Sequence, residues 1–188
     1  MTPFEYVSVL ISIILGLGIT QIVSGLADIV QHRHQVQLYW PHLMWIVFAF
    51  FLHIQEWWVL YDLRTLSDWK LPTFLFTILY PINLFILARI LFPSNMGTSP
   101  VDLKSFYFLN YRKFFGWAVI LIVLSLIDNL VLNGYSWSEQ PVHLFLLLLL
   151  SVLIYKNLQH EWLHKLIVVL LTVLLFASLL LVDWTIRS

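Results

Sequence analysis

Several ionisable and amide side chains in this sequence lie within long apolar stretches, where they could bind or transfer a proton or a cation. His53 and Glu56 are three residues apart, which places both on one face of a helix. Asp128 and Asn129 lie in a later apolar stretch. Burying a charged group among apolar residues is costly unless it has a partner. We therefore expect Glu56 and Asp128 to lie at similar depth and to face the interior of the protein.

This set of residues has two interpretations. In the structural one, the side chains form hydrogen bonds that hold helices together. In the functional one, they form a proton or cation site in which Glu56 titrates and His53 relays the proton. Pro81 supports the functional one, because a proline within a helix frees a backbone carbonyl. The predicted ion or substrate pathway comprises Gln21, His53, Glu56, Asn83, Asp128 and Asn129.

A short string near the end of the chain matches a catalytic motif. His160-Glu161-Trp162-Leu163-His164 has the His-Glu-x-x-His pattern, in which two histidines one turn apart bind zinc and the glutamate is the base. It resembles the zincin pattern over these five residues alone. Lys165 follows directly, and no third ligand is evident nearby. A zinc-dependent membrane enzyme, a metallohydrolase, is therefore an alternative function. The structural interpretation is a basic, histidine-containing turn that binds no cofactor.

The composition indicates what surrounds these residues. Hydrophobic residues make up 61% of the 188 and charged residues 11%, whereas soluble domains carry about 25% charged residues. So few charges cannot cover a surface that faces water, so the lipid bilayer must surround most of this protein. The net charge is zero, which gives no indication of nucleic-acid binding. The absence of cysteine excludes disulfides and thiolate metal sites.

We therefore predict an all-α, polytopic integral membrane protein, a bundle of about six transmembrane helices in a single domain over residues 1–188. A helix needs about 20 apolar residues to cross the hydrocarbon core. The predicted helices cover residues 4–30, 40–61, 71–92, 114–132, 142–157 and 163–182. Prolines at 41, 72 and 141 favour three of these starts. A separate short helix over residues 100–112 is predicted to lie in the membrane interface, because it is aromatic and basic.

The distribution of basic residues predicts the orientation. In a six-helix arrangement seven of them fall on one side, namely Arg33, Arg89, Lys104, Arg112, Lys113, Lys156 and Lys165. On the other side fall Arg64, Lys70 and Arg187. Because basic residues are enriched on the cytoplasmic side, we expect an inner-membrane protein with both termini outside the cytoplasm.

The first predicted helix carries small and polar residues at every fourth position, namely Ser8, Ser12, Gly16, Thr20, Ser24 and Asp28, and Gly18, Gln21 and Gly25 add to this stripe. Small residues allow membrane helices to approach one another closely. We expect this stripe to be a packing surface, either within the bundle or in a homo-oligomer formed through this helix. The alternative is that it lines a polar path.

The sequence thus favours a small channel or transporter for an ion, a proton or a small solute. The alternatives are the zinc enzyme and a non-catalytic subunit or sensor in a larger complex.

Overall fold

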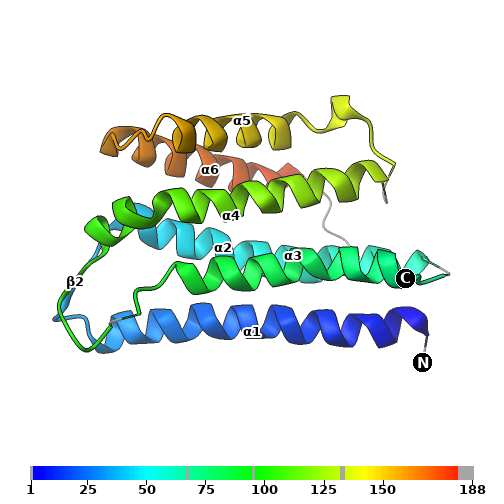
Figure 1. The fold of residues 1–188 in the computed structure, drawn as a ribbon, viewed down its shortest axis with the longest axis horizontal. Coiled ribbons are helices and arrows are strands. Elements are labelled where there is room, and N and C mark those ends of the chain that lie inside the picture. Colours follow the sequence, from blue (N-terminus) through cyan, green and yellow to red (C-terminus); the bar gives the residue numbers. More distant parts are fainter. Residues whose placement is uncertain (1, 67, 95, 132–133, 182–188) are drawn as a thin grey trace.

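The computed structural model describes residues 2–66, 68–94, 96–131 and 134–181. Within these residues the chain forms six α-helices in an up-and-down bundle (Figure 1). They are α1 (Pro3–Gln31), α2 (Trp40–Val59), α3 (Leu71–Ile90), α4 (Leu103–Val131), α5 (Pro141–Tyr155) and α6 (Glu161–Leu181). There are also two short 3-10 helices: η1 (Leu60–Thr65) follows α2, and η2 (Trp137–Glu139) precedes α5.

In the described part of the chain, α1, α2 with η1, α3, α4 and α6 are long and apolar enough to cross a membrane. Helix α5 is apolar but has 15 residues, about 22 Å at 1.5 Å per residue. The predicted all-α membrane bundle is confirmed. Prolines lie in the first turns of α2, α3 and α5, as predicted.

The predicted interfacial helix over residues 100–112 is not a separate element. Residues from Leu103 onward form the first turns of α4, which continues without a break to Val131. The reason is a buried stripe at fourfold spacing, which runs through Leu103, Tyr107, Tyr111 and Phe115. The predicted helix ends at 132 and 182 lie outside the described residues.

The connections α1–α2, α3–α4 and α5–α6 meet at one end of the bundle, which we call the strand end (Figure 1). There β1 (Val36–Gln37) pairs in parallel with β2 (Val101–Asp102). Asp102 accepts hydrogen bonds from the backbone of Lys104 and from the hydroxyl of Ser105 at 2.5 Å. These bonds hold the pKa of Asp102 below its usual range. The chain begins at the opposite end.

Helix α1 packs mainly against α3 and α2. Its buried side has helical spacing and consists of Val7, Ile11, Leu15, Gly18, Ile22, Gly25 and Ile29. Gly16 and Thr20 lie on the other side of α1 and are exposed. The second half of the predicted fourfold stripe, from Gly16 to Asp28, is therefore not a packing surface within the chain. Gly18 and Gly25, which add to the stripe, do lie on the buried side of α1.

Candidate functional site

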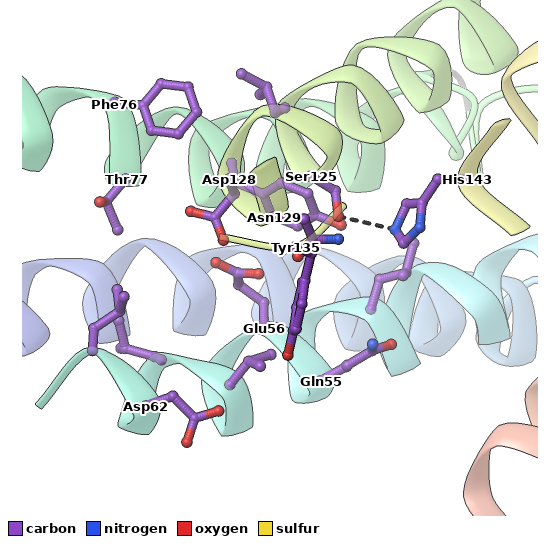
Figure 2. Close-up of a pocket in the computed structure, with 16 residues that line it drawn as sticks. Gln55, Glu56, Asp62, Phe76, Thr77, Ser125, Asp128, Asn129, Tyr135 and His143 are labelled. Atoms are coloured by element: carbon purple, nitrogen blue, oxygen red, sulfur yellow. Dashed lines mark hydrogen bonds between the residues drawn. The ribbon is translucent and has the colours of Figure 1, made fainter. Parts of the chain in front are cut away.

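A cavity of about 240 Å³ lies near the end opposite the strands. Its walls come from α2, η1, α3 and α4, with Tyr135 and the first turn of α5 at one side (Figure 2). The polar residues that line it are Gln55, Glu56, Asp62, Thr77, Tyr80, Ser125, Asp128, Asn129, Tyr135 and His143. Leucines, Val59 and Phe76 make up the rest. The cavity is therefore a polar space inside an otherwise apolar bundle.

Glu56 of α2 and Asp128 of α4 lie at the centre of this cavity. Figure 2 shows their carboxyl groups turned toward one another across the space between the two helices. Both side chains are half-buried. Like charges at close range repel, more strongly where water is scarce. A cation or a proton between the two carboxyl groups would relieve that repulsion.

The charge around the pair strengthens this preference. Asp62 supplies a third acidic side chain at the rim, and Arg64 lies 3.9 Å from it without lining the cavity. Among the described residues that line the cavity there is no lysine and no arginine. The charged side chains of the lining are therefore acidic, as a binding site for a cation requires.

Hydrogen bonds fix the wall between α4 and α5. Asn129 donates through Nδ2 to Oε1 of Gln140 at 2.8 Å. Ser125 Oγ and His143 Nε2 are 3.1 Å apart and share a second bond (Figure 2). On the α3 side the Thr77 hydroxyl donates to the carbonyl of Thr73 at 2.9 Å. These bonds hold the wall of the cavity in place. Because the Thr77 hydroxyl uses its hydrogen in this bond, its oxygen can still accept a hydrogen bond from a ligand.

His53 does not belong to this cavity, contrary to its predicted role as a relay for Glu56. The two side chains are about 60° apart around the axis of α2, and in this structure Glu56 lines the cavity whereas His53 does not. His53 is fully buried and faces α1 at Gly18. Its Nδ1 donates to the carbonyl of Ala49 at 2.6 Å. The His53 ring is therefore part of the α1–α2 contact.

Gln21 and Asn83 also lie away from the cavity. Gln21 is half-buried on α1. Asn83 is buried in α3 and donates through Nδ2 to the carbonyl of Leu79 in its own helix at 2.7 Å. Of the six predicted pathway residues, the structure thus brings together Glu56, Asp128 and Asn129.

Sequence reasoning missed several lining residues. Two of them had a usable signal, because Ser125 precedes Asp128 and Thr77 precedes Tyr80 by three residues, which puts each pair on one helix face. His143 and Tyr135 had none, because their position depends on how the α4–α5 connection folds back.

The geometry of the His-Glu-x-x-His string does not fit a zinc site. His164 is fully buried. Its Nε2 is 2.8 Å from the carbonyl of Leu158, and a carbonyl can only accept, so Nε2 carries the proton. Nδ1 therefore accepts from the hydroxyl of Tyr107 at 2.8 Å, and that hydroxyl accepts from Nε1 of Trp45 at 3.2 Å. Neither ring nitrogen of His164 has a free lone pair for a metal.

The other two residues of the string are placed unfavourably for zinc as well. His160 is exposed and precedes the first residue of α6. Glu161, the expected base, forms ion pairs with Lys104 at 2.5 Å and with Lys165 at 2.7 Å. Within the described residues no three histidine, aspartate or glutamate side chains converge on one metal position. The string instead links α4 to α6 at the strand end.

This arrangement predicts different effects for the two histidines. His164→Ala leaves a cavity and removes the partners of Tyr107 and Leu158, which should cost about 2–4 kcal/mol of stability. His160→Ala removes an exposed side chain and should change little. Thermal unfolding in detergent, followed by circular dichroism, measures both. If zinc raised the melting temperature of wild type but of neither histidine variant, both histidines would be zinc ligands and this assignment would be wrong.

The comparisons with known proteins give no family for this chain: no family model, no curated protein and no solved structure matches it. The arrangement of its own residues is therefore the basis for a functional assignment.

Proposed function

We propose that this chain is a small membrane transporter for a cation or a proton, with the cavity at Glu56 and Asp128 as its binding site. The observation that carries the proposal is the pair of carboxyl groups that face one another in a polar cavity within a bundle of membrane-spanning helices. Ionisable residues at such positions commonly mark ion pathways, because they are costly to keep there otherwise.

The packing beyond the cavity favours a carrier over an open channel. Toward the strand end, side chains from α1, α2 and α3 are at most 2% exposed, among them Leu15, Ile46, Ala49, Leu84 and Leu87. Such packing leaves little room for water between these side chains. A bound cation would therefore cross only when the helices move relative to one another, as in alternating-access transporters.

The test of this proposal compares ion and proton flux through vesicles that contain wild type or Glu56→Gln. Glutamine keeps the shape of the side chain and removes its charge. Loss of flux in a variant that still folds supports the proposal. The alternative of a non-catalytic subunit predicts that wild-type vesicles are no leakier than empty ones.

The proposed location is the inner membrane, with the strand end in the cytoplasm and both termini outside. Arg33, Lys104, Lys156 and Lys165 all belong to connections or helix turns at the strand end. In this orientation the cavity lies in the outer half of the bundle, with residues of η1 and Tyr135 among its lining.

Cysteine labelling tests the orientation, since the chain has no cysteine of its own. Ser99→Cys, in the α3–α4 connection, should not react with a membrane-impermeant maleimide added to intact cells. Ser138→Cys, in η2 at the opposite end, should react. The reverse pattern would place the termini in the cytoplasm.

We further propose that the chain forms a homo-oligomer through α1. Gly16, Thr20 and Ser24 are exposed along one side of this helix, and a Cβ added at Gly16 meets no atom within 4 Å. Small residues at fourfold spacing on the surface of a membrane helix allow a second helix to approach closely.

A further inference from the structure

A second hollow lies on the other side of Gln55. This groove, of about 190 Å³, runs between α2 and α6 in the same half of the bundle as the cavity. Phe51, Ile54 and Trp58 of α2 form one wall, and Leu175 and Leu179 of α6 form the other. Gln55 lines both the groove and the cavity. A polar space and an apolar space thus meet at one side chain.

The two hollows differ in chemistry. The cavity holds the carboxyl groups of Glu56 and Asp128, whereas the groove is apolar apart from Gln55 and Ser178. A ligand that fits both must carry a positive charge at one end and a hydrocarbon or aromatic group at the other. This is the pattern of an amphipathic organic cation.

The walls of the cavity also suit an organic ammonium better than a bare ion. Phe76, Tyr80 and Tyr135 contribute aromatic rings to it. Aromatic faces attract organic cations, most strongly where water is excluded. Leu52, Leu60 and Leu124 add apolar surface, against which alkyl groups on a nitrogen can pack.

Size leads to the same class of ligand. A water molecule occupies about 30 Å³ in the liquid, and a dehydrated metal ion is no larger than that. The cavity, at about 240 Å³, is therefore several times larger than such an ion needs. No three carboxylate or imidazole groups of the described chain converge as ligands for such an ion. A trimethylammonium group with its first methylenes fits this volume without special coordination geometry.

We propose that the ligand of this protein is an amphipathic organic cation, whose ammonium group binds between Glu56 and Asp128 and whose apolar group lies in the α2–α6 groove. This inference rests on the proposed function and specifies its substrate class. In this proposal the apolar group reaches the groove from the lipid, and the charged group passes Gln55 to enter the cavity.

The test uses the full chain in phosphatidylcholine nanodiscs and three radiolabelled probes. The first is 4-phenylbutyltrimethylammonium, which has both the charge and the apolar group. Tetramethylammonium has the charge alone, and 4-phenylbutanol has the apolar group alone. Equilibrium dialysis measures binding, and empty nanodiscs correct for partition into lipid.

We expect saturable binding of 4-phenylbutyltrimethylammonium, at least tenfold weaker binding of tetramethylammonium, and no binding of 4-phenylbutanol above the lipid background. Glu56→Gln should weaken the binding of the first probe more than tenfold. Asp128→Asn provides a second variant should Glu56→Gln fail to fold. Melting temperatures verify that each variant is folded.

Ser178→Phe tests the groove separately, because its ring would fill the space between the helices. It should weaken 4-phenylbutyltrimethylammonium binding about tenfold and leave tetramethylammonium binding unchanged. Ser151→Phe is the matched control, since Ser151 is exposed on α5 and lines neither hollow. It should change neither affinity.

The outcomes separate this inference from the proposed function. If both ammonium probes bind equally through Glu56 and Ser178→Phe has no effect, the cation site stands and the amphipathic ligand is wrong. Proton flux that depends on Glu56 without binding of any ammonium probe would likewise leave the transport site standing and overturn the amphipathic ligand. If no probe binds and no flux depends on Glu56, both proposals fail.

Discussion

Replacing Gly18 with leucine is expected to prevent the bundle from folding. Gly18 lies on the buried side of α1, where a Cβ would overlap the imidazole ring of the fully buried His53. Moving the ring aside would break the bond between its Nδ1 and the carbonyl of Ala49 and displace the side chains packed around it. Even alanine should force α1 and α2 apart, and overpacking of this kind costs about 1–3 kcal/mol or more. Expression and thermal unfolding in detergent measure the loss.

Gly16→Leu is the matched control, two residues away on the open side of the same helix. Because nothing lies within 4 Å of a Cβ at this position, the variant should fold with an unchanged melting temperature. Any effect of Gly16→Leu should be on assembly, seen as a smaller species by size-exclusion chromatography with light scattering. Equal destabilisation by both substitutions would contradict the packing of α1.

The helices themselves could be predicted from the sequence because lipid imposes a simple requirement. Each spanning segment must satisfy its own backbone hydrogen bonds and expose apolar side chains, so hydropathy and the prolines at 41, 72 and 141 suffice to locate most of them. The start of α4 was missed because Lys104, Arg112 and Lys113 suggested an interfacial segment. The aromatic residues at 107, 111 and 115 show why the helix continues: they form its buried side.

Which side of each helix faces the bundle was harder to predict. On α1 the small and polar stripe was expected to be a contact, yet the interleaved apolar side is buried. The polar stripe repeats strictly every four residues and so drifts around the helix, whereas the buried side mixes steps of three and four residues and stays on one side. Likewise, the helical spacing of His53 and Glu56 was correct, but an angle of about 60° between them was enough to place them in different environments.

The core of the site could be predicted, since ionisable residues in apolar stretches are few and must find partners. Glu56 and Asp128 come together in one cavity, on different helices. The contribution of Tyr135 and His143 could not be predicted, because it depends on the fold of a connection. The zinc hypothesis stays a prediction. The structure gives its residues other contacts, because His164 is fully buried and Glu161 pairs with Lys104 and Lys165.

The loss of cation or proton flux in Glu56→Gln is the second large effect that this structure predicts. If the two carboxyl groups together hold a cation or a proton, removing one charge removes most of the attraction for it. Glu56→Gln keeps the volume of the side chain and one oxygen that accepts hydrogen bonds, so the bundle should still fold. Asp28→Asn is the matched control, because Asp28 is exposed near the strand end of α1 and does not line the cavity.

The most direct measurement is flux into phosphatidylcholine vesicles that contain purified protein, driven by an inside-negative membrane potential. An internal pH-sensitive dye reports proton entry, and radiolabelled tetramethylammonium and 4-phenylbutyltrimethylammonium report cation entry. We expect wild type and Asp28→Asn to show saturable uptake of at least one of these, and Glu56→Gln to lower it at least tenfold, to the level of empty vesicles. Wild-type vesicles no leakier than empty ones, or equal uptake by wild type and Glu56→Gln, would contradict the proposal that this cavity carries cations across the membrane.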